Sequence, residues 1–462
     1  MEKSNRFVEL YHYLQDPHLV ARFQRFCGVR ETLSRSGTSP GTGKEADRAH
    51  SHNNGACHHH VAGGNESGIS AVIGAGEGEA EITQTGSPTR VLRRVADASV
   101  ATNRGEKSET SPPGNGALVS GGEATVKPLR RNSLTGDVGR EFLIENRFLY
   151  YMFTFGTELG NELFYITFFP FVTWNVDAFV GRRLIMVWVW VMYLGQCTKD
   201  LVGWSRPASP PVVKVEMFYN SEYSMPSTHA MSGTAIPISL FFLTYGRWEY
   251  PFTLGFSLAL CWCLLVCVSR IYMGMHSVLD VVVGVLYSAL ILLLFLPALD
   301  AIDGFNLTCG CAPLVIVSLH LLLGVFSFTL DTWSTSRGDT AQILGTGAGV
   351  AVASHLNRRL GLLPDAAPDR LPFATPHLGV GLVGAALLRL VLGVLVLMAT
   401  RALMKAVAIP LACRVFGVPG DDVRKARQHM EVELPYRYVV YGAVGFNMLF
   451  LVPLLFSYAP LS

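Results

Sequence analysis

The chain has 462 residues, and only 16% of them are charged, whereas soluble globular proteins carry about 25%. Hydrophobic residue types make up 50% of the chain and are concentrated after the polar first third, which is more than a soluble core requires. This composition excludes a cytosolic globular enzyme, and the net charge of +2, without a stripe of Lys and Arg among aromatics, gives no reason to expect nucleic-acid binding.

The N-terminal region divides into two parts. Within residues 1–35, apolar side chains between Phe7 and Phe26 recur at helical spacing with a break at Pro17. This pattern predicts short amphipathic helices that lie on a membrane or on the rest of the protein. Residues 36–140 are rich in Gly, Ser, Thr, Ala and Glu and show no helical or strand period, so we predict a long disordered tail.

Residues 141–462 contain apolar runs long enough to cross a hydrocarbon core of about 30 Å, which needs about 20 helical residues. We therefore predict an all-α, polytopic transmembrane helical bundle with about nine spans. The predicted spans are 148–175, 184–202, 229–246, 251–268, 278–298, 312–330, 340–356, 378–400 and 438–459. The first of them carries Glu158, Asn161 and Glu162 at its middle, which also fits a broken or re-entrant pair of helices, since carboxylates in lipid are costly.

Three short blocks hold the dense polar groups next to predicted spans. The first closes the second span with Lys199, six further residues and then Arg206. A guanidinium offers a planar fork to phosphate oxygens, and an ammonium offers a point charge. Taken alone, the block also fits basic side chains that hold a helix end at the membrane interface.

The second block is Pro226-Ser227-Thr228-His229, at the start of the third span. Proline in a first helical turn leaves the following amides unpaired, so the helix start presents N–H groups and hydroxyls to an anion. His229 follows directly, although a single histidine at this place also fits a structural role.

The third block joins the fourth and fifth spans and contains Ser269-Arg270, His276 and Asp280. If the helix has begun at His276, the two residues four apart share a face, and the carboxylate can fix the tautomer of the imidazole. The other ring nitrogen is then available as a nucleophile or base. The alternative is a simple buried pair that satisfies an aspartate near an apolar span.

The parity of the spans brings all three blocks to one membrane face. Together they supply three cations, helix-start amides and two histidines in different surroundings. We expect no metal or other cofactor, because a zinc or two-metal site would need converging carboxylates, His or Cys, and these blocks offer mainly cations.

These blocks resemble the three-part signature of the type 2 phosphatidic acid phosphatase superfamily. Its second part more often reads PSGH, so Thr228 is a mild departure that keeps a hydroxyl and the amides. The surrounding segments GTELGNELFYI, VMYLGQCTKD, YNSEYSMPSTHAMSGTA and DDVRKARQHMEVELPYRY are similar to the sphingosine-1-phosphate phosphatase family within it. The resemblance covers about residues 128–462.

The resemblance implies an integral-membrane lipid phosphatase that acts through a phosphohistidine. His276 would attack phosphorus, Asp280 would orient it, and His229 would protonate the leaving alkoxide and then activate water. The phosphoryl oxygens would be held by Lys199, Arg206, Ser227, Thr228 and Arg270. Such a reaction needs mainly positioning and neutralisation of spread-out charge.

The implied substrates are sphingosine-1-phosphate and related long-chain base phosphates, taken from the lipid bilayer. Two alternatives remain: a broader lipid phosphate or polyprenyl pyrophosphate phosphatase, and a non-catalytic lipid-phosphate transporter or scaffold. Glu158 or Glu162 is a candidate contact for the ammonium of the long-chain base.

The resemblance also implies a multi-pass protein of the endoplasmic reticulum membrane, with a lumenal active site and a cytosolic amino terminus. Nine spans would instead put the basic 401–437 loop on the active face, which favours the cytosol by the positive-inside rule. We expect lumenal catalysis. The Asp331 to Asp339 segment is expected on the same face, as a candidate gating loop or as an ordinary capped connection between helices. Ser133 follows Arg130-Arg131 as a candidate kinase site.

Overall fold

The computed structural model describes residues 2–31, 125–127, 142–216, 222–330, 337–362, 365–376 and 379–459. The predicted disordered tail, apart from 125–127, lies outside the described residues. So do Ser133 and residues 331–336 of the candidate gating loop.

The N-terminal segment forms two helices, α1 (Glu2–Gln15) and α2 (Pro17–Phe26). Asp16 caps α2 by accepting a hydrogen bond from the His18 amide, and Pro17 occupies the first turn, where its missing N–H is not needed. A small antiparallel sheet follows, in which β3 (Phe142–Ile144) lies between β1 (Val29–Glu31) and β2 (Thr125–Lys127). The all-α prediction did not include this sheet, because strands of three residues carry no readable alternation.

The first predicted span is broken. It consists of α3 (Arg147–Glu158), α4 (Glu162–Phe171) and the π-helical turn η1 (Val172–Val176). The polar side chains at its middle therefore lie at a helix junction, and the broken pair foreseen from the sequence is confirmed.

Within the described residues, six helical segments are long and apolar enough to cross a membrane, which confirms the membrane-helical class. They are α5 (Ala178–Val202), α7 (Phe252–Tyr272), α8 (Val278–Thr308), α9 (Ala312–Leu330), α11 (Val380–Phe416), and α13 (Met430–Leu449) continued by α14 (Leu451–Tyr458). The other predicted spans correspond to α4 with its neighbours, to α6 (Thr228–Thr244) and to α10 (Arg337–Leu360). Because α4 and α6 are short and α10 is more polar, the number of about nine remains a prediction.

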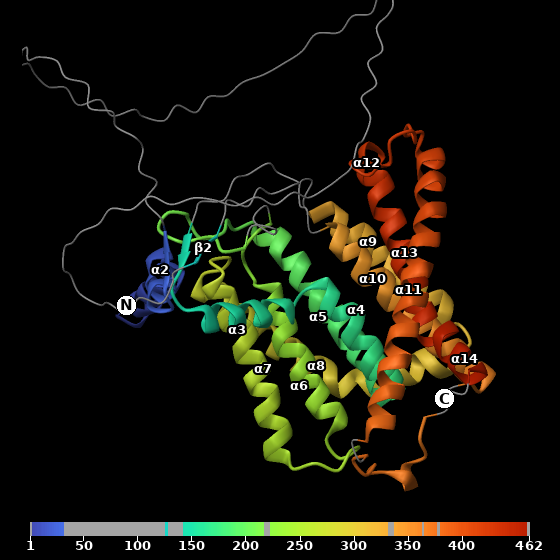
Figure 1. Cartoon of the computed structure of the whole chain (residues 1–462). Coiled ribbons are helices and arrows are strands. Elements are labelled where there is room, and N and C mark those ends of the chain that lie inside the picture. The colour runs from blue at the N-terminus through green and yellow to red at the C-terminus, as the bar shows by residue number, and fades with distance from the viewer. Residues whose placement is uncertain are drawn as a thin grey trace, which may run out of the picture. The chain divides into compact units, whose positions relative to one another are not determined.

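The tightest helix pair in the bundle is α10 with α13, which run side by side in Figure 1. Glycines make this approach possible: a Cβ added at Gly349 would overlap the carbonyl oxygen of Gly442, and one at Gly345 would overlap that of Tyr438. On its other sides α10 packs against α5 and α9.

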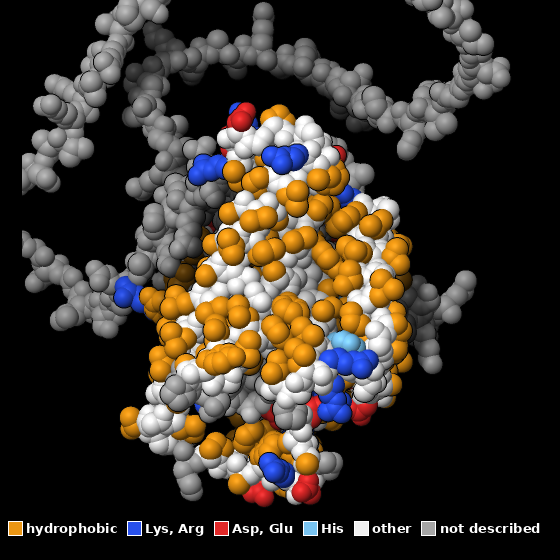
Figure 2. Space-filling view, turned by 90° about the vertical axis from the view of Figure 1, so that its right-hand side faces the viewer, with side chains coloured by type: hydrophobic (Ala, Val, Ile, Leu, Met, Phe, Trp, Pro, Cys, Tyr) orange, Lys and Arg blue, Asp and Glu red, His pale blue; other side chains and the backbone are white. Residues whose placement is uncertain are grey.

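The outer surface of the bundle is apolar. In Figure 2 hydrophobic side chains fill a broad band, and most charged side chains on this face gather at its two ends. Exposed side chains of this kind include Leu322 of α9 and Leu395 of α11. Such a band fits contact with lipid tails between two aqueous boundaries.

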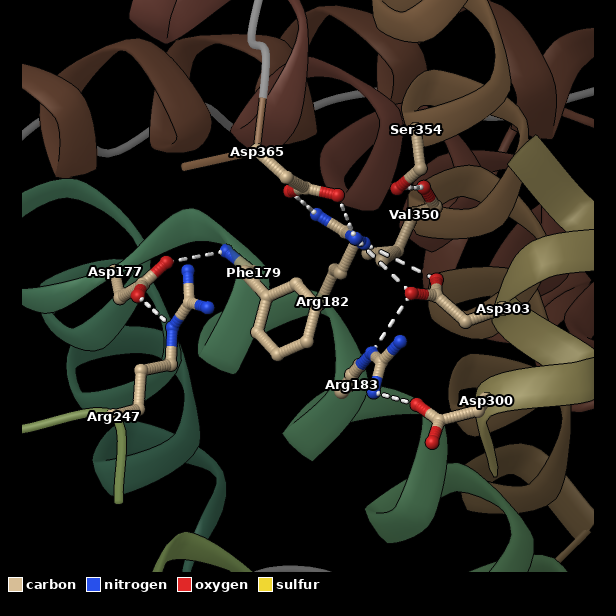
Figure 3. Close-up of polar contacts among 10 residues, drawn as sticks. All are labelled: Asp177, Phe179, Arg182, Arg183, Arg247, Asp300, Asp303, Val350, Ser354 and Asp365. Atoms are coloured by element: carbon tan, nitrogen blue, oxygen red, sulfur yellow. Dashed lines mark hydrogen bonds and ion pairs between the residues drawn. The ribbon is translucent and has the colours of Figure 1, made fainter. Parts of the chain in front are cut away.

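A network of buried ions closes the end of the bundle where α5 begins (Figure 3). Arg182 makes two hydrogen bonds to Asp303 of α8, at 3.1 and 3.0 Å, and two to Asp365, at 2.6 and 2.7 Å. Arg183 bonds to Asp303 and to the exposed Asp300. The guanidinium of Arg183 also lies 4.0 Å from the centre of the Phe179 ring. The paired forks tie α5, α8 and the segment after α10 together.

Two short elements complete the described chain: the 3₁₀ turn η2 (Pro368–Arg370) and α12 (Val423–Ala426), which joins α11 to α13. At 37 residues α11 is the longest helix described. It would extend for about 55 Å, well beyond a hydrocarbon core of about 30 Å.

Candidate active site

The three polar blocks meet at one end of the bundle. Lys199 lies in the last turn of α5, Ser227 caps the start of α6, and His276 lies between the end of α7 and the start of α8. The Lys199 Nζ atom is 3.3 Å from the Thr228 hydroxyl oxygen, and the Ser227 amide donates to the Asp280 carbonyl at 3.2 Å. The eight residues predicted from the sequence therefore belong to a single cluster.

His276 is buried, and its contacts define its protonation. The Arg206 Nη1 atom lies 3.2 Å from His276 Nε2. Because a guanidinium can only donate, Nε2 must be the unprotonated nitrogen. Burial first, and then the positive charges of Arg206, Arg270, Lys199 and Lys214, lower the pKa of His276 well below its ordinary value of 6.5. The ring is therefore neutral near pH 7, with its proton on Nδ1.

Asp280 reaches His276 through a serine rather than directly. Its Oδ2 atom is 3.8 Å from His276 Nδ1, which is too long for a hydrogen bond. Ser224 bridges the gap, with its hydroxyl oxygen 3.3 Å from Nδ1 and donating to Asp280 Oδ2 at 2.6 Å.

The helical premise for this pair was wrong, because α8 begins at Val278 and Ser277 is its N-cap. His276 thus precedes the helix instead of sharing a face with Asp280. Asp280 accepts the Ser277 amide at 2.7 Å and completes a capping box. The carboxylate is held rigidly by the start of its own helix.

His229 lies in the first turn of α6 and contacts the α3–α4 break. Its Nε2 atom is 3.2 Å from the Asn161 side-chain oxygen, and the Asn161 amide donates to Glu158 at 2.9 Å. A Cβ at Gly160 would come within 2.5 Å of the His229 ring. The break in the first span therefore supplies the surface on which this imidazole rests.

The cations of the cluster are buried and partly unpaired. Arg270 has no exposed surface and gives one Nη1 bond to Glu216 at 3.0 Å, while its Nε and Nη2 atoms have no partner among the described residues. Buried N–H groups without partners are expensive. A phosphate oxygen at this place would satisfy them.

Lys199 and Arg206 share one carboxylate. The Lys199 ammonium is 3.0 Å from Glu222 Oε2, and Arg206 Nη2 is 3.8 Å from the same atom. Arg206 also donates to the Met275 carbonyl at 2.8 Å, which fixes its plane beside His276. Burial lowers the pKa of Arg206 to about 10, so the guanidinium still carries its charge at neutral pH.

Three of the polar residues in this cluster were not singled out from the sequence: Glu216, Glu222 and Ser224. All lie between the first and second blocks, where the only signal was their closeness to the Pro226 helix start. Of the other acidic candidates, Glu162 already accepts from Tyr441 at 2.6 Å and lies 3.6 Å from Arg401. Its carboxylate is therefore already paired with Tyr441 and Arg401.

The N-terminal helices pack at the same end of the bundle as the site. The Gln24 side chain donates to the Val213 and Tyr272 carbonyls, at 2.7 and 2.9 Å, and accepts from the Val213 amide. The rings of Tyr11 and Trp204 are also in contact. These contacts hold residues 2–31 against the loops that surround the site.

One cavity among the described residues lies elsewhere. It has a volume of about 320 Å³ and lies between α5, α8, α9 and α10, beside Arg182 and Asp303. None of the predicted site residues lines it. The candidate active site is therefore defined by its polar contacts and not by this cavity.

Comparison with known families identifies the class of protein that carries this cluster. A family model described as the PAP2 superfamily matches residues 179–302, the segment that contains all three blocks. The chain is thus an integral-membrane protein with a PAP2 superfamily region.

Full-length relatives narrow the class. The chain is 53% identical over 464 residues to sphingosine-1-phosphate phosphatase 1 of Rattus norvegicus and to that of Mus musculus, with all of each chain covered. It is 35% identical to sphingosine-1-phosphate phosphatase 2 of Homo sapiens, over 97% of this chain and 98% of the relative. The chain belongs to the sphingosine-1-phosphate phosphatase family. No solved structure matches it.

Proposed function

We propose that the chain is a lipid phosphatase that hydrolyses sphingosine-1-phosphate and related long-chain base phosphates. Its full-length relatives are named for the first of these substrates. The observation that carries the proposal is the state of His276: it is buried and neutral, and its unprotonated Nε2 points to the guanidinium of Arg206. A binding protein needs cations but not an oriented nucleophile.

The first step transfers the phosphoryl group to His276. The lone pair of Nε2 attacks phosphorus, the N–P bond forms, and the P–O bond to the long-chain base breaks. His229 gives its proton to the leaving alkoxide, and the phosphate dianion stabilises the protonated form of that imidazole beforehand. Lys199, Arg206, Arg270 and the hydroxyls of Ser227 and Thr228 hold the phosphoryl oxygens.

The second step releases phosphate. His229, now neutral, takes a proton from water, and the oxygen attacks the phosphorus of phosphohistidine. The N–P bond breaks and returns His276 to its neutral form. Ser224 and Asp280 keep the Nδ1 proton of His276 in place during both steps. No cofactor enters this scheme.

The decisive experiment measures phosphate release from labelled sphingosine-1-phosphate by the purified protein in the presence of a chelator. We expect activity in the wild type, loss of activity in His276→Ala, and retention in His429→Ala, because His429 is exposed and its side chain makes no capping bond. Persisting activity in His276→Ala would contradict the nucleophile, and loss of wild-type activity in chelator would contradict a metal-independent reaction. Equal turnover of phosphatidic acid would favour the broader phosphatase.

The proposal includes a location, in which the site faces the lumen of the endoplasmic reticulum, as the family resemblance implies. Basic residues near α12 argue for the other side, so the orientation needs its own test. Cys311 is exposed in the turn between α8 and α9, at the end of α8 away from His276. In sealed microsomes we expect a membrane-impermeant maleimide to label Cys311; protection of Cys311 until the membrane is permeabilised would place catalysis in the cytosol.

A further inference from the structure

Glu222 is a carboxylate inside the cation cluster. Its Oε2 atom accepts the Lys199 ammonium at 3.0 Å, and its backbone carbonyl accepts Arg206 Nε at 3.0 Å. The side chain is 12% exposed, so it sits at the edge of the cluster. Among the described residues, its other oxygen, Oε1, has no hydrogen-bond partner.

Carboxylates already lie among the cations of the cluster before any ligand is bound. Glu222 lies beside Lys199 and Arg206, and Glu216 lies beside Arg270. A phosphate dianion that enters this cluster adds negative charge close to Glu222. A ligand whose phosphate is accompanied by a nearby cation offsets part of that added charge.

Sphingosine-1-phosphate has such a cation. Its ammonium is on the carbon next to the one that carries the phosphate ester, so the ammonium must lie close to the leaving oxygen. Lys199 bonds to both Glu222 and Thr228, and Thr228 directly precedes His229, the proposed acid for that oxygen. Glu222 is therefore linked through Lys199 to the residue next to the proposed acid.

Three other acidic side chains fit this role less well. Glu216 pairs with Arg270, which retains two unpaired donors for phosphate and does not need to release its partner. Glu162 is held by Arg401 and Tyr441. Glu158 is exposed, so water and salt screen its charge.

We propose that Glu222 binds the ammonium of the long-chain base and thereby selects amine-bearing phosphates over phosphates without an amine. This inference rests on the proposed function. Before substrate arrives, the same carboxylate occupies the cations that the phosphate will use, and Oε1 accepts the ammonium as the phosphate enters.

The test compares kcat/KM for sphingosine-1-phosphate with kcat/KM for a straight-chain alkyl phosphate of the same length. For Glu222→Gln we expect the preference for the amine-bearing substrate to fall by about 10-fold or more, since a charge-assisted hydrogen bond is replaced by a neutral one. Glu222→Asp, which keeps the charge, should retain part of the preference. Glu216→Gln should change both substrates by the same factor.

Equal changes for both substrates in Glu222→Gln would overturn the inference and leave Glu222 as a counterion of Lys199. A lost preference in Glu158→Gln, with Glu222→Gln unchanged, would move the ammonium contact to the exposed carboxylate. Thermal unfolding of each variant separates a folding defect from a change in selectivity, and Glu222→Asp carries the test if Glu222→Gln does not fold. Failure of the proposed function itself would look different, because the wild type would hydrolyse neither phosphate.

Discussion

Ser224 has a greater part in the cluster than its place in the sequence suggests. The Asp280 carboxylate is too far from His276 Nδ1 to accept its proton directly. The Ser224 hydroxyl lies between them and hydrogen-bonds to both. Asp280 is in turn fixed by the capping box of α8, so the order of the imidazole depends on a serine from a different segment. The relay keeps the proton on Nδ1 and leaves Nε2 as the unprotonated nitrogen, without a direct contact to an acid.

Replacing Ser224 with Ala should lower kcat by about 10-fold with little change in KM, because one buried hydrogen bond contributes about 1 kcal/mol or more. Single-turnover hydrolysis would measure the effect on the chemical step. Ser239→Ala is the matched control. Ser239, on α6, is buried like Ser224, but its hydroxyl has no partner among the described residues. A normal rate in Ser224→Ala would mean that Asp280 orients the ring without it.

The pH dependence follows from the lowered pKa of His276. A group whose pKa is depressed stays neutral as the pH falls below its ordinary value, so the acid limb of kcat/KM should lie below pH 6.5. Lys214→Gln removes one of the charges that depress this pKa, so its acid limb should move to higher pH. Because the substrate titrates equally in both proteins, only the difference between the two profiles reports on His276; coincident profiles would exclude an influence of Lys214.

The residues of the three blocks could be predicted because their chemistry is unusual next to apolar spans. Ser224, Glu216 and Glu222 could not, since serine and glutamate are ordinary in a loop and only folding brings them against His276 and the cations. Whether His276 shared a face with Asp280 depended on where α8 begins, and helix boundaries are the least certain part of a sequence-based prediction.

At the scale of the elements, glycine sets how closely the helices approach. The contact of α10 with α13 depends on backbone touching backbone at Gly345, Gly349 and Gly442, as in membrane helices that pack through small residues. Because α10 is surrounded by other helices and not by lipid, it can be more polar than its neighbours. A prediction that counts apolar runs cannot distinguish these two surroundings.

Gly349→Ala should destabilise the bundle by about 1–3 kcal/mol, because the added methyl overlaps a carbonyl that cannot move alone. Unfolding of the protein in detergent, induced by heat or denaturant, would measure the change in stability. Gly384→Ala on α11 is the control, since a Cβ there meets nothing within 4 Å and alanine favours the helix. Equal stability of the two variants would show that the helices separate to accommodate the methyl.

The N-terminal helices show the same limit of sequence reasoning. Their amphipathic spacing was readable, but it did not distinguish a membrane surface from a protein surface. Gln24 decides the question, because a buried amide with three backbone hydrogen bonds to the Val213 and Tyr272 region requires a protein partner. The tertiary contact, not the local pattern, determines where α2 lies.

On the scale of the whole molecule, the two ends of the bundle use charge differently. At the site end, Arg270 has two donors without a partner among the described residues, whereas at the other end Arg182 is saturated by Asp303 and Asp365. One end is prepared for a ligand, and the other holds helices that are far apart in the chain. Asp303 lies deepest in this second network, with 2% of its side chain exposed.

Asp303→Asn should lower the free energy of unfolding by about 3–5 kcal/mol, because it removes the buried carboxylate charge that the guanidinium groups of Arg182 and Arg183 share. Asp300→Asn is the matched control. Asp300 contacts Arg183 but its side chain is 84% exposed, so its loss should cost less than about 1 kcal/mol. The melting temperatures of the two variants, together with the activity that remains after heating, would measure the difference. Similar melting temperatures would argue that the network is dispensable.

The length of α11 has a practical consequence. Arg401 lies beside Glu162 near the site, and the turns of α11 beyond it lead to α12 and the start of α13 at the tip of the bundle (Figure 1). Asp421 and Asp422 at the tip are exposed. An antibody fragment raised against this tip would mark the catalytic side in electron micrographs and add mass for particle alignment, without covering the residues that handle the lipid.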